Sequence, residues 1–323
     1  MAETSSRLRF ALKLAVSGGL LAVVFSMIPL DGVARSLLAA RWELVALCLA
    51  VMFVAHYVKS IQMHLLTKPL GITLSPGRIF VINLITKFYG LFLPGIIAGG
   101  AIRWYHLSRE DRKPAQAFAA IIMNRVLETS VILGLGLGFW LLDRNAGTVL
   151  SGRVLVPVVA LSVLLYLLTF SRRVHALLLR WTALAAVPDR VAQKLRKVLA
   201  SLGQYEDLSR PEHLSIVVTV TLHHLLGLAS LALLARAVGI EVGFATLGWI
   251  RSLVTIATLV PVTIAGLGIR EASFVALLGP FGVPMSSALT LSLLVFGRGL
   301  AFAFAGGLLE ARRLIVGKKE FAG

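Results

Sequence analysis

Long apolar blocks constrain the fold of this chain more than any other feature. They recur at lengths of about 20 residues, which is what an α-helix needs to cross roughly 30 Å of hydrocarbon. The blocks that predict full membrane spans cover about residues 10–28, 43–66, 117–142, 150–170, 214–236 and 286–309. We therefore expect an all-α polytopic membrane protein that forms a single integral-membrane domain over residues 1–323.

The placement of basic residues predicts the orientation of these spans. The chain has 32 Lys and Arg against 15 Asp and Glu, for a net charge of +17. Such an excess is also found in nucleic-acid-binding proteins, but here the basic residues lie largely in short polar stretches beside apolar blocks. That is the cytoplasmic bias of membrane proteins, so we expect no nucleic-acid partner and both termini in the cytoplasm. The first apolar block predicts a retained span rather than a cleaved signal peptide.

The basic segment 171–213 is expected on the cytoplasmic side. Within it apolar and basic residues alternate with helical spacing, and Pro188 and Gly203 mark the ends of the expected helix. An amphipathic helix of this kind suits an anionic membrane surface. The alternative is a helix packed on the cytoplasmic face of the bundle.

Two further apolar regions, residues 78–107 and about 247–280, are too short for two full crossings each. Each has Pro and Gly residues at its centre, which predicts a re-entrant helical hairpin that enters and leaves on the same side. The expected breaks lie at Pro94, Gly95, Gly99 and Gly100 in the first region and at Pro261, Gly266 and Gly268 in the second. With its hairpins, the protein would be counted as having about eight transmembrane helices.

The two hairpin regions share a motif that indicates an internal repeat. Residues 94–103 read PGIIAGGAIR and residues 261–270 read PVTIAGLGIR, with six identities in ten at an offset of 167 positions. At the same offset, His56 corresponds to His223. An odd number of spans separates the hairpins, so the halves 10–142 and 150–309 are expected to be inverted repeats. Such proteins bind substrate near the midplane where the repeats meet.

Charged residues inside the apolar segments mark the candidate substrate site, because each is costly unless it faces a cavity, a counter-charge or a ligand. The basic ones are Lys87, Arg103, Arg125, Arg270 and Arg298, and the acidic ones are Glu128 and Glu271. Arg103 and Arg270 each end a glycine-containing break, where free backbone N–H groups and a helix N-terminus attract anions. A guanidinium there suits phosphate oxygens. The alternative is that both arginines anchor their hairpins at the interface.

Several of these groups have a second interpretation. Arg125 and Glu128 are three residues apart on one helical face and would form an ion pair. Lys59 is close enough to a span end to snorkel. His56 and His223 are expected to line one cavity, either as carriers of a proton coupled to transport or as packed polar groups. No HExxH, Walker A or GxSxG pattern occurs, and the single cysteine excludes a cysteine metal site. We expect no cofactor, no metal and no enzymatic activity.

These residues resemble the transmembrane flippase region of the lysylphosphatidylglycerol synthases, a region shared by many stand-alone bacterial membrane proteins. The resemblance covers about residues 10 to 313 and rests on Asn83, Pro94, Gly95, Gly99, Gly100, Arg103, Asn124, Arg125, Pro261, the GLGIRE of residues 266–271, Gly282 and Arg298. It implies a lipid-translocating fold for anionic or aminoacylated phospholipids. The family often has an acidic residue before the mid-span arginine, whereas this chain has Asn124. The sequence ends at Gly323 without an aminoacyltransferase domain, so we expect a stand-alone member.

The leading hypothesis is a flippase in the bacterial inner membrane that moves a lipid with an anionic, phosphate-bearing headgroup by alternating access. A second hypothesis is a membrane-embedded enzyme acting on a lipid phosphate, with Glu271 as its acid or base. A third is a non-catalytic subunit that assembles with a lipid-modifying enzyme. The sequence does not identify the lipid, the driving force or the oligomeric state.

Overall fold

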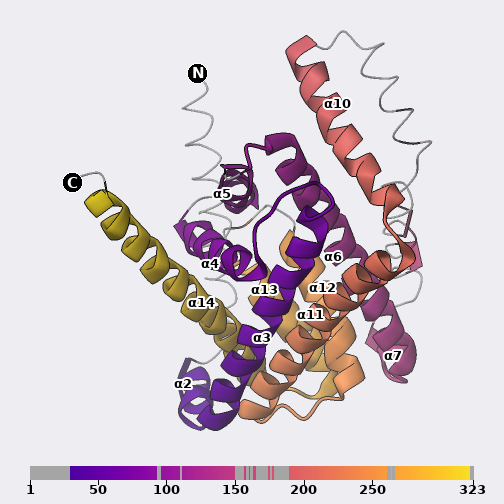
Figure 1. The fold of residues 1–323 in the computed structure, drawn as a ribbon. Helices are drawn as coiled ribbons and strands as arrows, with labels where there is room; N and C mark the ends of the chain where they lie inside the picture. Colours follow the sequence, from indigo (N-terminus) through magenta and orange to yellow (C-terminus); the bar gives the residue numbers. More distant parts are fainter. Residues whose placement is uncertain are drawn as a thin grey trace, which may run out of the picture.

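The computed structural model describes residues 30–92, 96–109, 111–149, 189–259 and 266–320, with isolated positions between these ranges. Within the described residues every regular element is helical (Figure 1). The spans predicted near residues 10–28 and 150–170 lie outside them, as do the predicted break residues Pro94, Gly95 and Pro261.

Four long helices form the framework. They are α3 (Trp42–Thr67), α6 (Pro114–Leu142), α11 (Arg210–Ala237) and α14 (Met285–Glu320). Among the described residues, these four helices are long and apolar enough to cross a membrane, α14 over Met285–Arg313. The membrane-helical character predicted from the apolar blocks is therefore confirmed. The first turn of α6 and of α11 contains a proline, which suits this position because the first-turn N–H groups have no partner within the helix.

Four shorter helices lie in the two regions predicted to be hairpins. The first region contains α4 (Pro76–Phe92) and α5 (Ile96–Arg109), which pack on each other, and the second contains α12 (Phe244–Leu259) and α13 (Ile269–Leu278), which do the same. At 17 and 16 residues, α4 and α12 are about 26 and 24 Å long, less than the roughly 30 Å of a hydrocarbon core. The remaining elements are α2 (Leu30–Leu38), α7 (Ala146–Val149), α10 (Asp189–Gly203), η1 (Gln204–Asp207) and η2 (Gly279–Phe281).

Helices of the two halves pack in matching pairs. The pair α3 and α11 has the most extensive contact among the described elements, and its two helices are antiparallel, because the N–H of Arg41 donates to the carbonyl of Ala237 and the hydroxyl of Tyr205 donates to that of Leu66. Helix α4 packs on α14 of the second half, and α12 packs on α6 of the first. The first helix of each short pair thus lies against a long helix from the other part of the sequence.

Glycines allow the closest of these crossings. A Cβ at Gly306 of α14 would collide with the backbone of Leu84 in α4, so the two backbones touch there. A Cβ at Gly136 of α6 would lie 2.7 Å from the Cβ of Ser252 in α12. Small residues at helix interfaces permit this approach in membrane proteins, where lipid offers no hydrophobic drive for helices to associate.

Helix α10 packs on the bundle, as the second interpretation of the basic segment predicted. It packs on α6, and its Ala192 and Leu202 are 5% and 7% exposed. Its Val191 and Leu195 remain 48% and 43% exposed. One side of the helix therefore belongs to the bundle, while the other keeps apolar side chains available for a membrane surface. Figure 1 shows α10 at the same end of the molecule as the end of α14.

Candidate functional site

A cavity of about 210 Å³ lies between α3, α4, α5, α11, α12 and α14, and we call it the first chamber. Five of its ten lining residues are basic: Lys59, Lys87, Arg103, Arg251 and Arg298. His56, Asn83 and His223 also line it. The chamber gathers side chains that lie far apart in the sequence, and both halves of the chain contribute to it.

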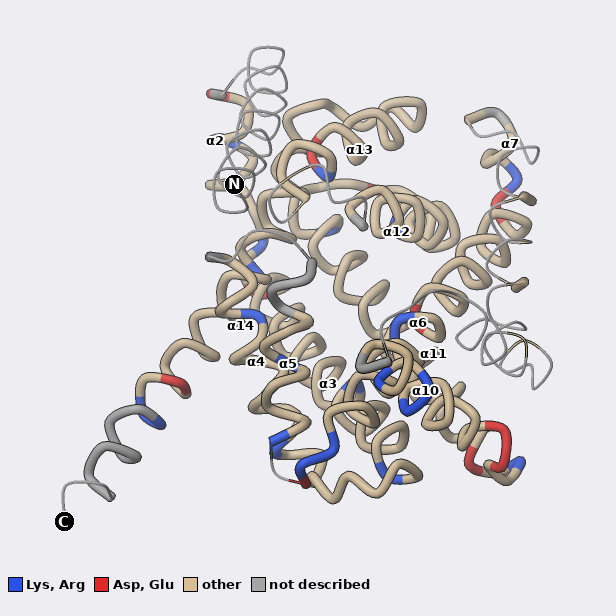
Figure 2. The backbone as a smooth tube through the Cα atoms, turned by 90° about the horizontal axis from the view of Figure 1, so that it is seen from above, with Lys and Arg blue, Asp and Glu red and all other residues tan. Residues whose placement is uncertain are grey.

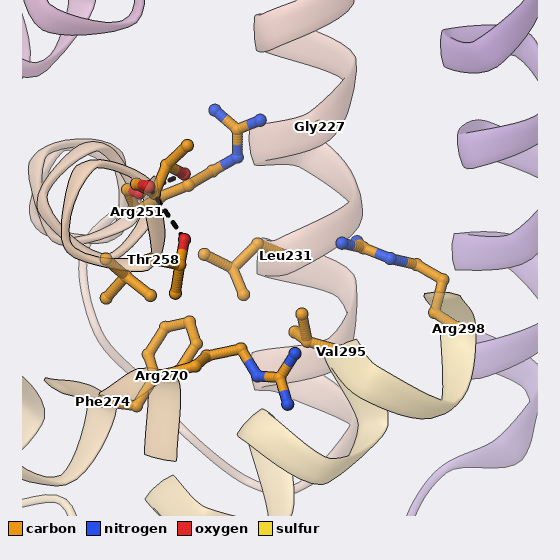
Figure 3. Close-up of a pocket in the computed structure, with 10 residues that line it drawn as sticks. Gly227, Leu231, Arg251, Thr258, Arg270, Phe274, Val295 and Arg298 are labelled. Carbon is orange, nitrogen blue, oxygen red and sulfur yellow. Dashed lines mark hydrogen bonds between the residues drawn. The ribbon is translucent and has the colours of Figure 1, made fainter. Parts of the chain in front are cut away.

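A second chamber of about 240 Å³ adjoins the first, since Gly227, Arg251 and Arg298 line both. It adds Arg270 as a third arginine. Figure 3 shows Arg251, Arg270 and Arg298 extending from α12, α13 and α14 around Leu231 of α11. Together the two chambers are lined by six basic residues.

Gly227 determines how Arg251 is placed. A Cβ on Gly227 would collide with the guanidinium of Arg251, so this group lies directly against the bare backbone of α11. One turn further along α11, the hydroxyl of Ser230 accepts a hydrogen bond from Arg298 and donates to the carbonyl of Gly227 at 3.1 Å. Small side chains on α11 thus make room for two guanidinium groups.

Two of the six basic residues have a carboxylate partner. Lys59 Nζ lies 2.6 Å from Glu128 Oε1, which joins α3 to α6. Lys59 was expected to snorkel toward a span end, but its ammonium group instead pairs with Glu128 inside the bundle, and its side chain lines the first chamber. The expected partner of Glu128, Arg125, is exposed and lines neither chamber. Asn124, in the place of the family's frequent acidic residue, instead accepts a hydrogen bond of 2.8 Å from Gln62.

The second ion pair joins Arg270 and Glu271. Arg270 Nη2 lies 2.6 Å from Glu271 Oε1, and the Arg270 Nε also donates to Ser292 Oγ at 3.1 Å. Glu271 is fully buried, and its other oxygen accepts the N–H of Gly268 at 2.7 Å. Glu271 therefore holds the N-terminus of α13 and orients Arg270, while it lines neither chamber.

Arg103 and Arg270 differ in position although their motifs match. Arg270 is the second residue of α13, as expected for a guanidinium beside a helix N-terminus. Arg103 is the eighth residue of α5, so its expected place at a helix start is wrong. Gly266 and Gly268 have φ values of +73° and +84°, which only glycine adopts readily, and they delay the start of α13. Gly99 and Gly100 instead lie within α5, so that helix begins earlier relative to the motif.

His56 and His223 lie together in the first chamber, with ring centroids 6.5 Å apart. The Nδ1 of His223 is 3.0 Å from the carbonyl oxygen of Ala55, so this nitrogen donates a proton and Nε2 is left as an acceptor in the neutral ring. The Nε2 of His56 is buried with no hydrogen-bond partner among the described residues. The structure thus brings together the two histidines that the repeat aligned.

The other four basic residues are not balanced by acidic groups. Among the described residues, Lys87, Arg103, Arg251 and Arg298 have no carboxylate within 4.0 Å. Figure 2 shows how few acidic positions the described tube contains compared with basic ones. The sequence reasoning missed Arg251, although its signal was present: it is a single charge in the apolar run FATLGWIRSLVTIATL of α12.

The family comparison agrees with this architecture. A family model described as the lysylphosphatidylglycerol synthase TM region matches residues 10–307. A curated relative, the "UPF0104 membrane protein MJ1595" of Methanocaldococcus jannaschii, is 28% identical over 112 residues, which is 34% of this chain and 33% of the relative. The chain thus matches about a third of that relative's length. No solved structure matches the chain. With nearly its whole length covered by the family model, the chain belongs to the family of the lysylphosphatidylglycerol synthase TM region, a group of membrane proteins of lipid-related function.

Proposed function

We propose that this protein moves a lipid with an anionic, phosphate-bearing headgroup across the bacterial inner membrane through the two chambers. The observation that carries the proposal is the charge imbalance of the chambers: six basic side chains line them, and only Lys59 and Arg270 have a carboxylate partner, which in each case lies outside the lining. A charge at the centre of a transmembrane helix costs about 2.5 to 3.5 kcal/mol on insertion scales. A phosphate headgroup would offset this cost, because guanidinium and ammonium groups bind phosphate through charge-assisted hydrogen bonds.

The packing of the helices supports a transport mechanism. Helix α4 covers residues 76–92, and the repeat offset of 167 positions aligns these residues with 243–259. Helix α12, at Phe244–Leu259, occupies almost the same range, so the two helices are equivalent in the repeat. The matching contacts of α4 with α14 and of α12 with α6 suit two inverted halves with their substrate site between them. On this proposal α4 with α5 and α12 with α13 are re-entrant hairpins from opposite sides, and alternating access moves one half against the other.

The geometry favours transport over chemistry on the lipid. Glu271, the acid or base of the enzyme hypothesis, has both oxygens engaged and is sealed from the chambers. A general acid or base needs hydrogen-bond reach to the reacting group.

The test replaces the unpaired charges, Lys87→Met and Arg251→Met, in protein reconstituted into liposomes. We expect the movement of fluorescent phosphatidylglycerol to fall by roughly tenfold or more, since a hydrogen bond to a charged group contributes about 1.5 to 3 kcal/mol. Thermal stability should stay constant or rise, because each change removes a partly buried charge that has no carboxylate partner among the described residues. Arg236→Gln is the matched control, since Arg236 is an exposed arginine of α11 that lines neither chamber.

Two results would contradict the proposal. One is a wild-type rate of lipid movement in folded Lys87→Met and Arg251→Met proteins. The other is a change in the mass of the lipid itself during the assay, because this would indicate an enzyme. Loss of transport together with loss of folded protein in both variants would show that the two charges are structural.

A further inference from the structure

The two chambers meet at a place that concentrates positive charge, and we call it the junction. It is formed by Gly227 of α11, Arg251 of α12 and Arg298 of α14, the residues that line both chambers. Figure 3 shows the two guanidinium groups reaching toward α11 from different helices. The charges of Arg251 and Arg298 are close enough to repel each other. Two like charges are thus held beside one cavity.

The protein uses little of the hydrogen-bonding capacity of these two arginines. A guanidinium has several N–H donors and no acceptor. Arg298 contacts the hydroxyl of Ser230 and the thiol of Cys48. Among the described residues, the guanidinium of Arg251 has no carboxylate within 4.0 Å and donates to no protein acceptor. Most of the donors at the junction therefore remain for a ligand that accepts hydrogen bonds and carries negative charge.

The surroundings of the junction make the repulsion between the two arginines costly. Apolar side chains form much of the wall of the second chamber, namely Leu231, Val254, Phe274 and Val295. Charges interact more strongly beside such a wall than in water, because the local dielectric constant is lower. Gly227 fixes the position of Arg251, since its lack of a Cβ is what gives the guanidinium its place against α11. A bound anion would offset this repulsion.

The same surroundings favour a small, singly charged anion. The cost of moving an ion from water into a site of low dielectric constant rises with the square of its charge, so a doubly charged phosphate or sulfate loses far more hydration energy than a halide. The second chamber has a volume of about 240 Å³. A spherical halide fits there and accepts hydrogen bonds from both guanidinium groups at once, because it imposes no angle on its donors.

We infer that the junction binds one small monovalent inorganic anion, chloride under ordinary conditions, between the guanidinium groups of Arg251 and Arg298. The anion neutralises part of the positive charge and holds the two arginines in their facing positions. This site goes beyond the proposed function, because it needs only the junction and does not require that the protein move lipid. A headgroup that reaches either arginine has to displace the anion first.

The test measures binding of radioactive chloride by equilibrium dialysis of the whole purified protein in an uncharged detergent, with gluconate keeping the ionic strength constant. We expect one chloride per protein, released by bromide and nitrate but not by phosphate or sulfate at the same concentration. Arg251→Gln and Arg298→Gln should each weaken binding roughly tenfold or more, since each removes charge-assisted hydrogen bonds. Saturating chloride should also raise the melting temperature of the wild type above its value in gluconate.

Two further variants test the position of the site. Gly227→Ala removes no charge but places a Cβ where the guanidinium of Arg251 lies, so it should weaken chloride binding as well. Arg236→Gln is the matched control, because Arg236 is an exposed arginine of the same helix that lines neither chamber. It should bind chloride as the wild type does.

The outcomes separate this inference from the transport proposal, because chloride binding is read without any lipid movement. Protein that binds chloride but moves no lipid contradicts the transport proposal alone. Wild-type protein that holds no chloride, or folded Gln variants that bind it as tightly as the wild type, would overturn this inference alone. Release by phosphate as readily as by bromide would also overturn it, in favour of a phosphate site. Should a Gln variant lack a normal melting transition, Gly227→Ala and the wild-type measurement decide.

Discussion

At the scale of single residues, the role of each buried arginine depends on whether a carboxylate lies within reach. Arg270 and Glu271 form a pair in which the carboxylate is fully buried, whereas Arg251 lies against the bare backbone at Gly227. Removing one member of a buried pair leaves the other charge uncompensated, which costs about 3 to 5 kcal/mol. Arg270 is thus expected to stabilise the fold, in addition to any contact that it makes with the substrate.

We predict that Arg270→Gln and Glu271→Gln will each lower the melting temperature markedly. The double variant should lose less stability than the two single variants lose together. The reason is that the second change removes the charge that the first leaves buried. Melting followed by tryptophan fluorescence in detergent, arranged as a double-mutant cycle, measures the coupling. Strictly additive losses would show that the pair contributes nothing to stability.

Asp143, which follows the last residue of α6, ties that helix to α12. Its Oδ2 accepts hydrogen bonds of 2.7 Å from Thr246 and 2.8 Å from Trp249, while Oδ1 accepts the N–H of Asn145 at 3.0 Å. Burial acts to raise the pKa of Asp143, but the hydrogen bonds from Trp249, Thr246 and Asn145 outweigh it and hold the pKa below its ordinary value. The stabilisation is therefore present above the unfolded-state pKa of about 4 and is lost as pH falls through the lower folded-state pKa.

The corresponding prediction is that Asp143→Asn lowers the melting temperature at neutral pH, and that its difference from the wild type shrinks below about pH 4. Melting curves recorded across this pH range check both statements. Asp207→Asn is a suitable control, because it changes an exposed carboxylate in η1, away from the contact between α6 and α12. A difference that stays constant with pH would mean that the charge of Asp143 plays no part.

At the scale of elements, the crossing of α4 and α14 is set by a glycine. The backbone contact at Gly306 leaves no space for a Cβ, whereas a Cβ at Gly299 of the same helix would meet nothing within 4 Å. In an open helical position, Gly→Ala stabilises a protein by about 0.4 to 1 kcal/mol, because alanine loses less chain entropy on folding. Replacement by alanine should therefore lower the stability of the protein at Gly306 and raise it at Gly299.

We predict that Gly306→Ala lowers the melting temperature and reduces lipid movement, since it forces α4 away from α14, while Gly299→Ala raises the melting temperature or leaves it unchanged. Thermal unfolding and the liposome assay, performed on both variants, provide the comparison. A Gly306→Ala protein as stable as Gly299→Ala would show that the two helices do not meet at this backbone contact.

Much of the helical plan could be predicted from the sequence, because apolar run length and an internal repeat are local patterns. The offset of 167 positions aligned α4 with α12 and brought His56 to His223. The conformation of the glycines could not be predicted, because glycine is stable both in a helix and at positive φ. The prediction of a helix N-terminus was therefore correct at Arg270 and wrong at Arg103. Ion pairs between different helices, such as Lys59 with Glu128, also could not be predicted, because they depend on which helices pack together in the fold.

At the scale of the whole molecule, the turn after the α4–α5 pair and the loop before α12 lie at different ends of the bundle. The turn that contains Arg112 joins the α4–α5 pair to α6, at the end where α14 ends, and the loop before α12 lies at the end where α3 begins (Figure 1). With the positive-inside rule, the first end is expected in the cytoplasm and the second outside. This arrangement is the basis of the proposed opposite orientation of the hairpins.

The orientation is checked by cysteine labelling in intact cells after the buried Cys48 is replaced by alanine. We predict that a membrane-impermeant maleimide labels Glu241→Cys from outside and reaches Arg112→Cys only after the cells are opened. Both native side chains are exposed, so the reagent has access to either position. Labelling of both from the same side would rule out hairpins of opposite orientation.

The contact between α4 and α14 also bears on how the chain is made. Leu84 and Gly306, which meet at this crossing, are 222 positions apart in the sequence. At a synthesis rate of about 5 to 20 residues per second, α4 leaves the ribosome some 10 to 45 s before its main partner exists. During that interval its apolar surface has to be covered by lipid, by the insertion machinery or by helices already made. The native contact between α4 and α14 therefore forms only after α14 has been synthesised.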